Sequence, residues 1–334
     1  MKKIDRCPSL LAEGHTTYSP LAIRRLFNGM KANPILDFII EDFQSAIDIN
    51  DALHRISVSG VQEKFPAIIE DGAIRISDPG VRSTHILKPA PWDMTLQNRK
   101  QIPANEHLTM QIASQVYGIA TAENGLCFTP KGQPVYITRR FDILPDGEKL
   151  QMEDFASVIG RKERGGDLQF KYNGTYEEIA SAIRETVPAW MVDMERFFNL
   201  VVYNYIYANG DAHLKNFSLI NSDGNYRLAP AYDLINTSLH VNGDDFGLDG
   251  GLSTNIEMSD TYERTGHPCR ADFEQFGIRI GLPPKRIARV LDQYMHIPEK
   301  AVALISRSYL DPKLRRQYRS IVSERVARFI RPGD

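Results

Sequence analysis

The stretch Asn209-Gly210-Asp211-Ala212-His213-Leu214-Lys215-Asn216-Phe217 follows directly on an apolar, aromatic-rich run from 194 to 208. The apolar run predicts a long, largely buried helix that ends at Asn209-Gly210, where a short polar loop begins. Within this loop Asp211 and Asn216 are five positions apart. That pair suits phosphoryl transfer, which needs a carboxylate to orient a hydroxyl and an amide oxygen to bind Mg²⁺. Because Asp and Asn are also common turn formers, an ordinary turn explains this segment equally well when it is considered alone.

A second acidic residue, Asp233, follows a predicted hairpin. Apolar runs at 216–220 and 226–228 flank Asn221-Ser222-Asp223-Gly224, so Asp211, Asn216 and Asp233 should lie near one end of a two-stranded ribbon. Asp233 is then the natural second Mg²⁺ ligand, and a helix N-cap before residue 234 is its alternative role. The tripeptide Asp245-Phe246-Gly247 has the composition of a metal-binding motif. Its Gly- and Asp-rich surroundings predict a surface loop and a coincidental match.

Residues upstream of this loop have the character of a nucleotide site. The segment Ser57-Val58-Ser59-Gly60-Val61-Gln62-Glu63-Lys64 leads into a hairpin, which Asp71-Gly72 predicts between strands at 65–69 and 73–77. With one glycine it is a weak phosphate-binding loop, and a strand with surface serines is an equal alternative. Lys88 ends an apolar strand at 85–88, where an ammonium can reach nucleotide phosphates. Glu106, in the first turn of a helix predicted from 105 to 117, is a candidate partner for Lys88.

The chain has 334 residues and a formal net charge of -2, with 40 Lys plus Arg and 42 Asp plus Glu. These values indicate a soluble globular protein of about two folding units, and they exclude nucleic-acid binding by bulk charge. Three distant cysteines predict buried, reduced thiols rather than disulfides. The N-terminus lacks the apolar core of a signal peptide and no run of 18 apolar residues occurs, so we expect a cytoplasmic protein. The basic stretch 307–331 favours a solvated helix face over a surface for nucleic acid or an acidic partner.

The predicted secondary structure changes near the middle of the chain. Residues 53–142 suggest short strands, two of them at 126–129 and 135–141, interrupted by the helix that begins at 105. After residue 150 the pattern is helical, with a capping box at Thr175 and two or three amphipathic helices between 284 and 330. We therefore predict an α+β fold with two lobes. The strand-rich N-lobe covers residues 1–140 and the mainly helical C-lobe covers residues 141–334.

In their order along the chain, these segments resemble the successive motifs of HipA-type serine/threonine kinases, the toxins of bacterial toxin–antitoxin systems. The resemblance begins near residue 50 and extends almost to the C-terminus. The segments that carry it are Ser57 to Lys64, Thr84 to Lys88, Asn105-Glu106, Arg140-Phe141-Asp142, Gln151 to Phe155, Asp211 to Phe217 and Pro230 to Asp233. It implies a two-lobed kinase fold, distantly similar to that of phosphatidylinositol kinases.

The resemblance also implies a role for each matching residue. Asp211 would be the catalytic base, and Asn216 and Asp233 would bind Mg²⁺. Lys88 and the loop Ser59-Gly60-Val61-Gln62-Glu63-Lys64 would bind the phosphates of ATP. The adenine hinge would be formed by Arg139, Arg140 and Phe141, through backbone groups and the Phe141 ring, while His213, Lys215 and Tyr232 would line the nucleotide site. Autophosphorylation would regulate the enzyme at Ser57, Ser59 or both.

With 56 residues before Ser57, the chain is similar to the shorter HipT toxins, which lack the N-terminal subdomain of HipA. That similarity implies a HipB-like helix-turn-helix antitoxin and a HipS-like small protein as partners, DNA contact only through the antitoxin, and an aminoacyl-tRNA synthetase as substrate. At the hinge, Arg139 replaces a glutamate of HipA. Two alternatives stay open: a catalytically silent subunit that holds an antitoxin on DNA, and a small-molecule phosphotransferase. The intact set of Asp211, Asn216, Asp233 and Lys88 disfavours the first, and the serine loop disfavours the second.

Overall fold

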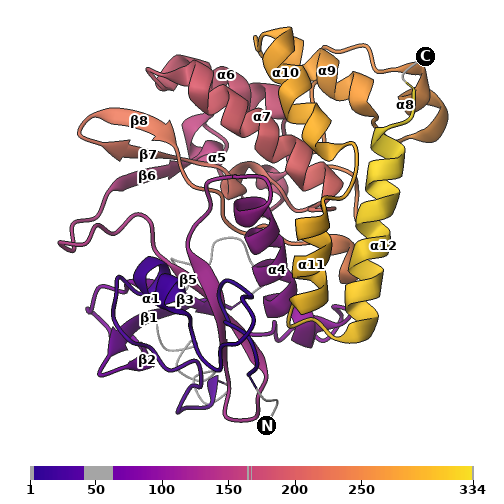
Figure 1. The fold of residues 1–334 in the computed structure, drawn as a ribbon. Helices are drawn as coiled ribbons and strands as arrows, with labels where there is room; N and C mark the ends of the chain where they lie inside the picture. The colour runs from indigo at the N-terminus through magenta and orange to yellow at the C-terminus, as the bar shows by residue number, and fades with distance from the viewer. Residues whose placement is uncertain (1–3, 41–62, 164, 167, 333–334) are drawn as a thin grey trace.

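The computed structural model describes residues 4–40, 63–163, 165–166 and 168–332. A five-stranded antiparallel sheet forms one part of the molecule and a mainly helical part lies against it (Figure 1). The strand order in the sheet is β2-β1-β3-β5-β4. The strands are β1 (Phe65–Glu70), β2 (Ala73–Ile76), β3 (His85–Lys88), β4 (Asn124–Phe128) and β5 (Pro134–Arg139).

The hairpin predicted at Asp71-Gly72 is confirmed. Asp71 and Gly72 have φ angles of 48° and 77°, and Glu70 pairs with Ala73 across the turn. Positive φ at both central residues is the geometry of the tight turns that join antiparallel strands. The strand predicted at 135–141 ends at Arg139, so Arg140 and Phe141 lie outside the sheet.

The N-terminal segment covers one face of this sheet and forms a hydrophobic core with it. It contains helix α1 (Pro20–Leu26), whose N-cap Ser19 accepts a hydrogen bond from the Ala22 N–H. The Tyr18 hydroxyl donates to the Leu126 carbonyl at 2.7 Å. Two buried histidines complete the attachment: His85 Nε2 bonds the Leu26 carbonyl at 2.9 Å, and His107 Nε2 bonds the Ser9 carbonyl at 2.7 Å.

Between β3 and β4 in the sequence, the chain forms a helix that packs against the sheet. The 3₁₀ turn η2 (Arg99–Gln101) leads into α4 (Ile102–Gln115), which begins three residues earlier than predicted because Ile102-Pro103 starts its first turn. Glu106 therefore lies in the second turn. Nearly every side chain of α4 up to Ala113 is buried, so α4 is a core helix rather than a surface helix with one apolar face.

The helical part contains a second, three-stranded antiparallel sheet with the order β6-β7-β8. The predicted hairpin is confirmed as β7 (Ser218–Ser222) and β8 (Asn225–Leu228), and β6 (Gln151–Asp154) adds a strand that we did not predict. The capping box at Thr175 is present, with both of its hydrogen bonds. The helices and turns are α5 (Phe155–Val158), η3 (Leu168–Lys171), α6 (Tyr176–Thr186), α7 (Trp190–Ile206), η4 (Leu214–Asn216), η5 (Thr237–Leu239), α8 (Asp260–Thr265), α9 (Arg270–Arg279), α10 (Pro284–Leu291), η6 (Asp292–Tyr294), α11 (Glu299–Arg307) and α12 (Pro312–Phe329).

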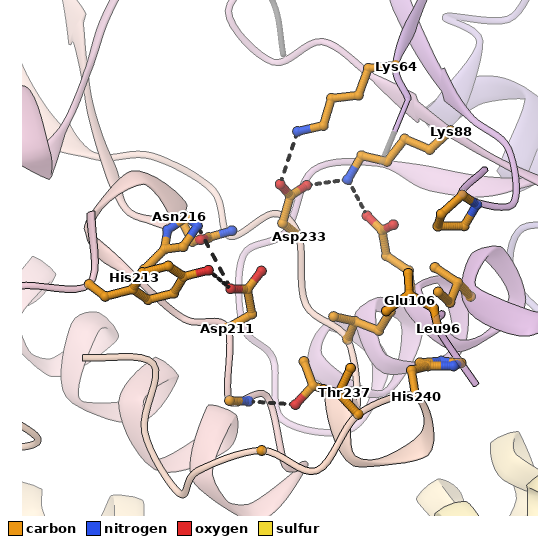
Figure 2. A pocket seen from close by; sticks show the side chains of 17 residues that line it. Lys64, Lys88, Leu96, Glu106, Asp211, His213, Asn216, Asp233, Thr237 and His240 are labelled. Atoms are coloured by element: carbon orange, nitrogen blue, oxygen red, sulfur yellow. Dashed lines mark hydrogen bonds and ion pairs between the residues drawn. The ribbon is translucent and has the colours of Figure 1, made fainter. Parts of the chain in front are cut away.

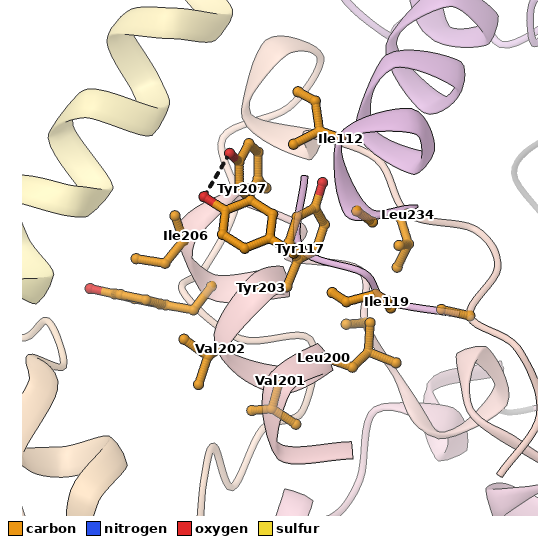
Figure 3. Packing of buried hydrophobic residues seen from close by; sticks show 14 of the residues in the cluster. Ile112, Tyr117, Ile119, Leu200, Val201, Val202, Tyr203, Ile206, Tyr207 and Leu234 are labelled. Carbon is orange, nitrogen blue, oxygen red and sulfur yellow. Dashed lines mark hydrogen bonds between the residues drawn. The ribbon is translucent and has the colours of Figure 1, made fainter. Parts of the chain in front are cut away.

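A cluster of buried tyrosines joins α4 to α7 and to the helices after it (Figure 3). Tyr117 stacks on Tyr294 with ring centroids 4.6 Å apart, and Tyr203 stacks on Tyr207 at 4.4 Å. The Tyr117 and Tyr207 hydroxyls are 3.1 Å apart, so their polar ends satisfy each other inside the core. This packing fixes the end of α7, from which the loop at 209–217 leaves, relative to α4.

The tripeptide Asp245-Phe246-Gly247 is not a surface loop, and that prediction is wrong. The Asp245 side chain is 12% exposed and forms ion pairs with Arg325 and Arg328 of α12. Phe246 packs against the core, and a Cβ on Gly247 would lie 2.4 Å from the backbone nitrogen of Ala212. The segment therefore packs directly against the loop that carries Asp211.

The same contacts correct the expectation for the basic stretch 307–331. Arg325 is 5% exposed and belongs to the interior, while Lys313, Arg316 and Arg319 lie on the exposed face of α12. The three cysteines are buried free thiols, as predicted. In the described part of the chain, every helix is too short or too polar to cross a membrane.

Candidate active site

The loop after α7 is held in place by hydrogen bonds between its backbone and Thr237. Ala208 adopts a left-handed conformation with φ of 54°, which ends the helix, and the Gly210 N–H donates to Thr237 Oγ1 at 3.0 Å. Gly210 has room for no side chain, since a Cβ there would lie 2.8 Å from the Asp244 carbonyl oxygen. The 3₁₀ turn η4 then places Asn216 on the same cavity as Asp211.

A buried lysine lies at the centre of the site, in contact with two carboxylates (Figure 2). The Lys88 ammonium donates to Glu106 Oε1 at 2.6 Å and also to Asp233 Oδ1. Burial by itself would lower the pKa of Lys88, but the two carboxylates raise it overall, so the ammonium stays charged. The pairing of Lys88 with Glu106 that we expected is therefore confirmed.

Asp233 also accepts a hydrogen bond from Lys64, whose Nζ lies 3.4 Å from Asp233 Oδ2. Burial would raise the pKa of Asp233, and the charges of Lys64 and Lys88 outweigh it and lower that pKa. Asp233 has a left-handed backbone with φ of 57°, a conformation that costs a non-glycine residue about 1 kcal/mol and that clusters at functional sites. Residues 234–236, which follow Asp233 directly, form no helix, and the next helical turn has Asn236 as its N-cap, so the alternative role of Asp233 as an N-cap is wrong.

Asp211 faces the same cavity from the opposite wall (Figure 2). The Tyr172 hydroxyl donates to Asp211 Oδ1 at 2.8 Å, and the Tyr172 ring meets the His213 ring edge-on at 5.1 Å. Burial raises the pKa of Asp211, and the hydrogen bond from Tyr172 partly offsets this. Burial also lowers the pKa of His213 to about 3, so its imidazole is neutral near pH 7.

The side chains present fit a divalent metal ion. Asn216 Oδ1 is buried and has no hydrogen-bond partner among the described residues. It lines the cavity together with Asp233, which supplies a carboxylate held in its charged form. An amide oxygen and a charged carboxylate are the oxygen ligands that Mg²⁺ takes from proteins.

A second cavity of about 410 Å³ extends from Lys88 and Asp233 to the start of the connection after β5. Phe141 and Tyr232 line it, with ring centroids 5.8 Å apart, and Lys215 lines it while paired with Asp154 at 3.5 Å. The lining of this cavity thus combines aromatic rings with lysine ammonium groups, a combination that suits a nucleotide. Arg139 and Arg140 border it as well.

At the predicted hinge, two backbone donors are already used. The Arg139 N–H donates to the Glu123 carbonyl at 2.8 Å, and the Arg140 N–H donates to the Thr84 carbonyl at 2.9 Å. The Arg140 guanidinium pairs with Asp142 at 2.6 Å. These two amides are therefore not free to bind a ligand, whereas the Phe141 ring lines the cavity.

Of the candidate residues in the loop at 57–64, the structure describes only Glu63 and Lys64. Glu63 accepts a hydrogen bond from the Trp92 N–H at 3.2 Å and lines neither cavity, whereas Lys64 lines both. Ser57, Ser59, Gly60, Val61 and Gln62 lie outside the described residues. Their predicted roles in phosphate binding and autophosphorylation stay predictions.

Sequence reasoning missed Tyr172, and no pattern near it points to the site. It follows η3 directly and reaches Asp211 across 39 positions of sequence. Its neighbour Lys171 is buried, and the Lys171 ammonium lies 5.0 Å from the Tyr172 ring centroid. His240 was missed too, although it lines the cavity beside Glu106.

The molecule combines a strand-rich lobe with a helical lobe. Between them, one cavity is lined by the Lys88–Glu106 pair, Asp211 and Asp233. This arrangement is that of a kinase-like fold. The chain belongs to the family of the HipA-like C-terminal domain, which matches residues 56–301. The solved complex of HipA, HipB and operator DNA from Shewanella oneidensis contains a chain of the same fold, with a TM-score of 0.64 at 18% identity. The alignment covers 88% of this chain and 71% of that one, and the predicted two-lobed kinase fold is confirmed.

Among curated relatives, the chain is similar to the putative kinase Y4mE of Sinorhizobium fredii, with 24% identity over 77% of this chain and 59% of that protein. It is 25% identical to a putative kinase of Haemophilus influenzae, over 89% of this chain and 88% of that one. It is also 23% identical to the serine/threonine-protein kinase toxin HipA of Shewanella oneidensis, over 63% of this chain and 50% of the toxin. The chain thus spans little more than half the length of Y4mE and half that of HipA.

Proposed function

We propose that the protein is an ATP- and Mg²⁺-dependent protein serine/threonine kinase. The observation that carries the proposal is the buried Lys88 ammonium between Glu106 and Asp233, with Asp211 and the unpartnered Asn216 Oδ1 on the same cavity. Active protein kinases need a lysine–glutamate ion pair and a metal-binding aspartate in place together. The names of relatives as kinases support the same activity.

In this proposal each side chain has a separate task. Lys88 and Lys64 neutralise phosphate charge. Asp211 orients the acceptor hydroxyl and takes its proton as the oxygen bonds to the γ-phosphorus of ATP, while the bond from that phosphorus to the bridging oxygen breaks and ADP leaves. Asn216 and Asp233 would hold Mg²⁺, which would offset the negative charge of the phosphoryl group. The neutral His213 contributes no charge and borders both cavities. Positioning and electrostatics account for catalysis of this kind.

The biological role that we propose is that of a toxin in a toxin–antitoxin system, of the short HipT type. The relative from Shewanella oneidensis is named a kinase toxin, and a solved complex contains HipA with HipB and operator DNA. We propose an aminoacyl-tRNA synthetase in the cytoplasm as substrate, autophosphorylation at Ser57 or Ser59 as the switch, and a HipB-like antitoxin with a HipS-like protein as partners.

Transfer of radiolabelled phosphate tests the activity. Purified protein with labelled ATP and Mg²⁺ should label itself and a protein in a pool of aminoacyl-tRNA synthetases, and Asp211→Asn should remove both labels. The matched control is Asp223→Asn, the same chemical change in the exposed turn between β7 and β8, which should label like the wild type. Equal labelling by the wild type and Asp211→Asn would contradict the proposal.

A further inference from the structure

Two cavities meet at the Lys88–Asp233 pair, and they differ in what lies beyond it. Both are lined by Lys64, Lys88, His213, Asn216 and Asp233. One continues to the aromatic pair of Phe141 and Tyr232, which is the nucleotide side in the proposed function. The other holds about 300 Å³ and contains Asp211, the proposed base. The acceptor hydroxyl must approach Asp211, so this second cavity lies on the acceptor side.

The outer part of the second cavity is apolar. Its walls there are formed by Pro91, Leu96, Ile102, Ile235 and Val241. The charged side chains of the cavity lie together around Lys88, and Leu96 lies on the far side of Glu106 from Asp211 (Figure 2). A ligand that places a hydroxyl at the inner end therefore presents an apolar group to the outer end, because burying a charge against these walls without a partner is costly.

The walls of this outer part are held in place by hydrogen bonds between two loops. The Gln97 N–H donates to the His240 carbonyl at 3.2 Å, and the Asn98 amide donates to the Leu239 carbonyl at 3.0 Å. His240 Nδ1 lies 2.8 Å from the Gln97 carbonyl and its Nε2 lies 2.8 Å from the Asn105 amide, so Nδ1 carries the proton. Burial lowers the pKa of His240 and keeps this ring neutral. The cavity is thus largely formed before any ligand enters.

Two apolar side chains at or near this cavity are exposed. Val241, which lines it, is 42% exposed, and Met94, two residues before the lining residue Leu96, is 75% exposed. An apolar pocket with exposed apolar side chains at and near its lining suits a polypeptide segment that lies across the opening better than a small, enclosed metabolite.

We propose that this outer cavity is a substrate subsite, which binds an apolar side chain next to the acceptor serine or threonine of the protein substrate. The inference rests on the proposed kinase activity and adds the class of substrate sequence that the site selects. Burial of one Leu, Met or Phe side chain there gives an expected gain of about 10- to 100-fold in kcat/KM over alanine at the same position.

Short serine peptides that differ only at residues flanking the serine provide the test. The wild type should prefer Leu, Met or Phe over Ala, Asp or Lys at one flanking position. Leu96→Asp and Val241→Asp should abolish that preference and favour Lys there, with the KM for ATP unchanged. Val192→Asp, at a 51%-exposed position on α7, is the matched control and should keep the wild-type preference. A urea midpoint for each variant confirms that it is folded.

The outcomes separate this inference from the proposed function. If the wild type forms no ADP and labels no protein or peptide, the kinase activity fails and the subsite fails with it. If the wild type labels peptides without a flanking preference, or if Leu96→Asp and Val241→Asp keep the apolar preference, the subsite is wrong while the kinase activity stands. Transfer to a metabolite but to no peptide also overturns the subsite.

Discussion

Replacing Asp245 by asparagine should destabilise the protein without removing phosphoryl transfer. Asp245 is ion-paired with Arg325, which is 5% exposed, and with Arg328 at 3.5 Å, and its Oδ2 lies 2.7 Å from His267 Nδ1. Removal of one partner of a buried ion pair costs about 3–5 kcal/mol, because the other charge stays buried without compensation. Asparagine keeps one hydrogen-bond acceptor, so we expect about 3 kcal/mol, a large fraction of the stability of a folded protein.

Urea unfolding measures this loss. With a slope of about 3 kcal/mol per molar, the midpoint of Asp245→Asn should fall by about 1 M. Adding Arg325→Met removes the uncompensated charge. The double variant should therefore lose less free energy of unfolding than the two single variants lose together, with a coupling of about 2 kcal/mol. Arg325 also lies over the Tyr205 ring at 5.1 Å, so Arg325→Met alone has a cost of its own.

The activity of the folded variant decides between a structural and a metal-binding role. Asp245→Asn should transfer phosphate at a rate near that of the wild type at low temperature, where it is folded. Asp233→Asn, the same change at the proposed metal ligand, should remove activity. If Asp245→Asn keeps the wild-type urea midpoint and loses phosphoryl transfer, Asp245 acts in metal binding and the structural argument is refuted.

Three further predictions concern the site and the N-terminal core. Lys88→Met should lower phosphoryl transfer at least about 100-fold and also lower the urea midpoint, since Glu106 loses its buried counter-charge; unchanged transfer would contradict the role of Lys88. Tyr172→Phe removes a donor from Asp211, so the acidic limb of the kcat/KM profile should move up by about one pH unit or less; Tyr262→Phe, an unrelated surface change, should leave it in place. Burial lowers the pKa of both His85 and His107 to about 4, so the folded state binds fewer protons than the unfolded state between pH 6.5 and 4. Stability should therefore fall by about 1.4 kcal/mol per pH unit for each histidine as the pH drops through this window, and a double glutamine variant should show a shallower dependence in urea unfolding at pH 7 and pH 5.

The elements that were predicted correctly depend on local interactions. The hairpin at Asp71-Gly72 follows from the left-handed conformations that these two residues tolerate, and the capping box at Thr175 from two hydrogen bonds within one turn. The order of the serine loop, Lys88, Glu106, Asp211 with Asn216, and Asp233 along the chain likewise supported the resemblance that implied the kinase-like fold. Such features lie within a few residues, or in a linear order, and the sequence displays them directly.

Two features that the sequence did not show concern contacts between distant segments. A Gly- and Asp-rich composition at 242–251 suggested a surface loop, but Arg325, 80 positions later, draws Asp245 into the interior. The Arg140 N–H is bonded to the Thr84 carbonyl, 56 positions earlier, so this donor at the predicted hinge is already used. In both cases the partner is set by packing, and neither segment carries a local pattern that names it.

The sequence by itself determined the chemistry of the site, because residue types and their order specify which groups can bind a phosphate, a metal or a proton. Only the tertiary structure decided which of those groups contact one another and how deeply they are buried. It placed Lys88 between two carboxylates, brought the Tyr172 hydroxyl to Asp211, and formed a cavity with apolar walls beside Asp211. These arrangements depend on burial and on distances between segments far apart in the chain, and electrostatic interactions change with both.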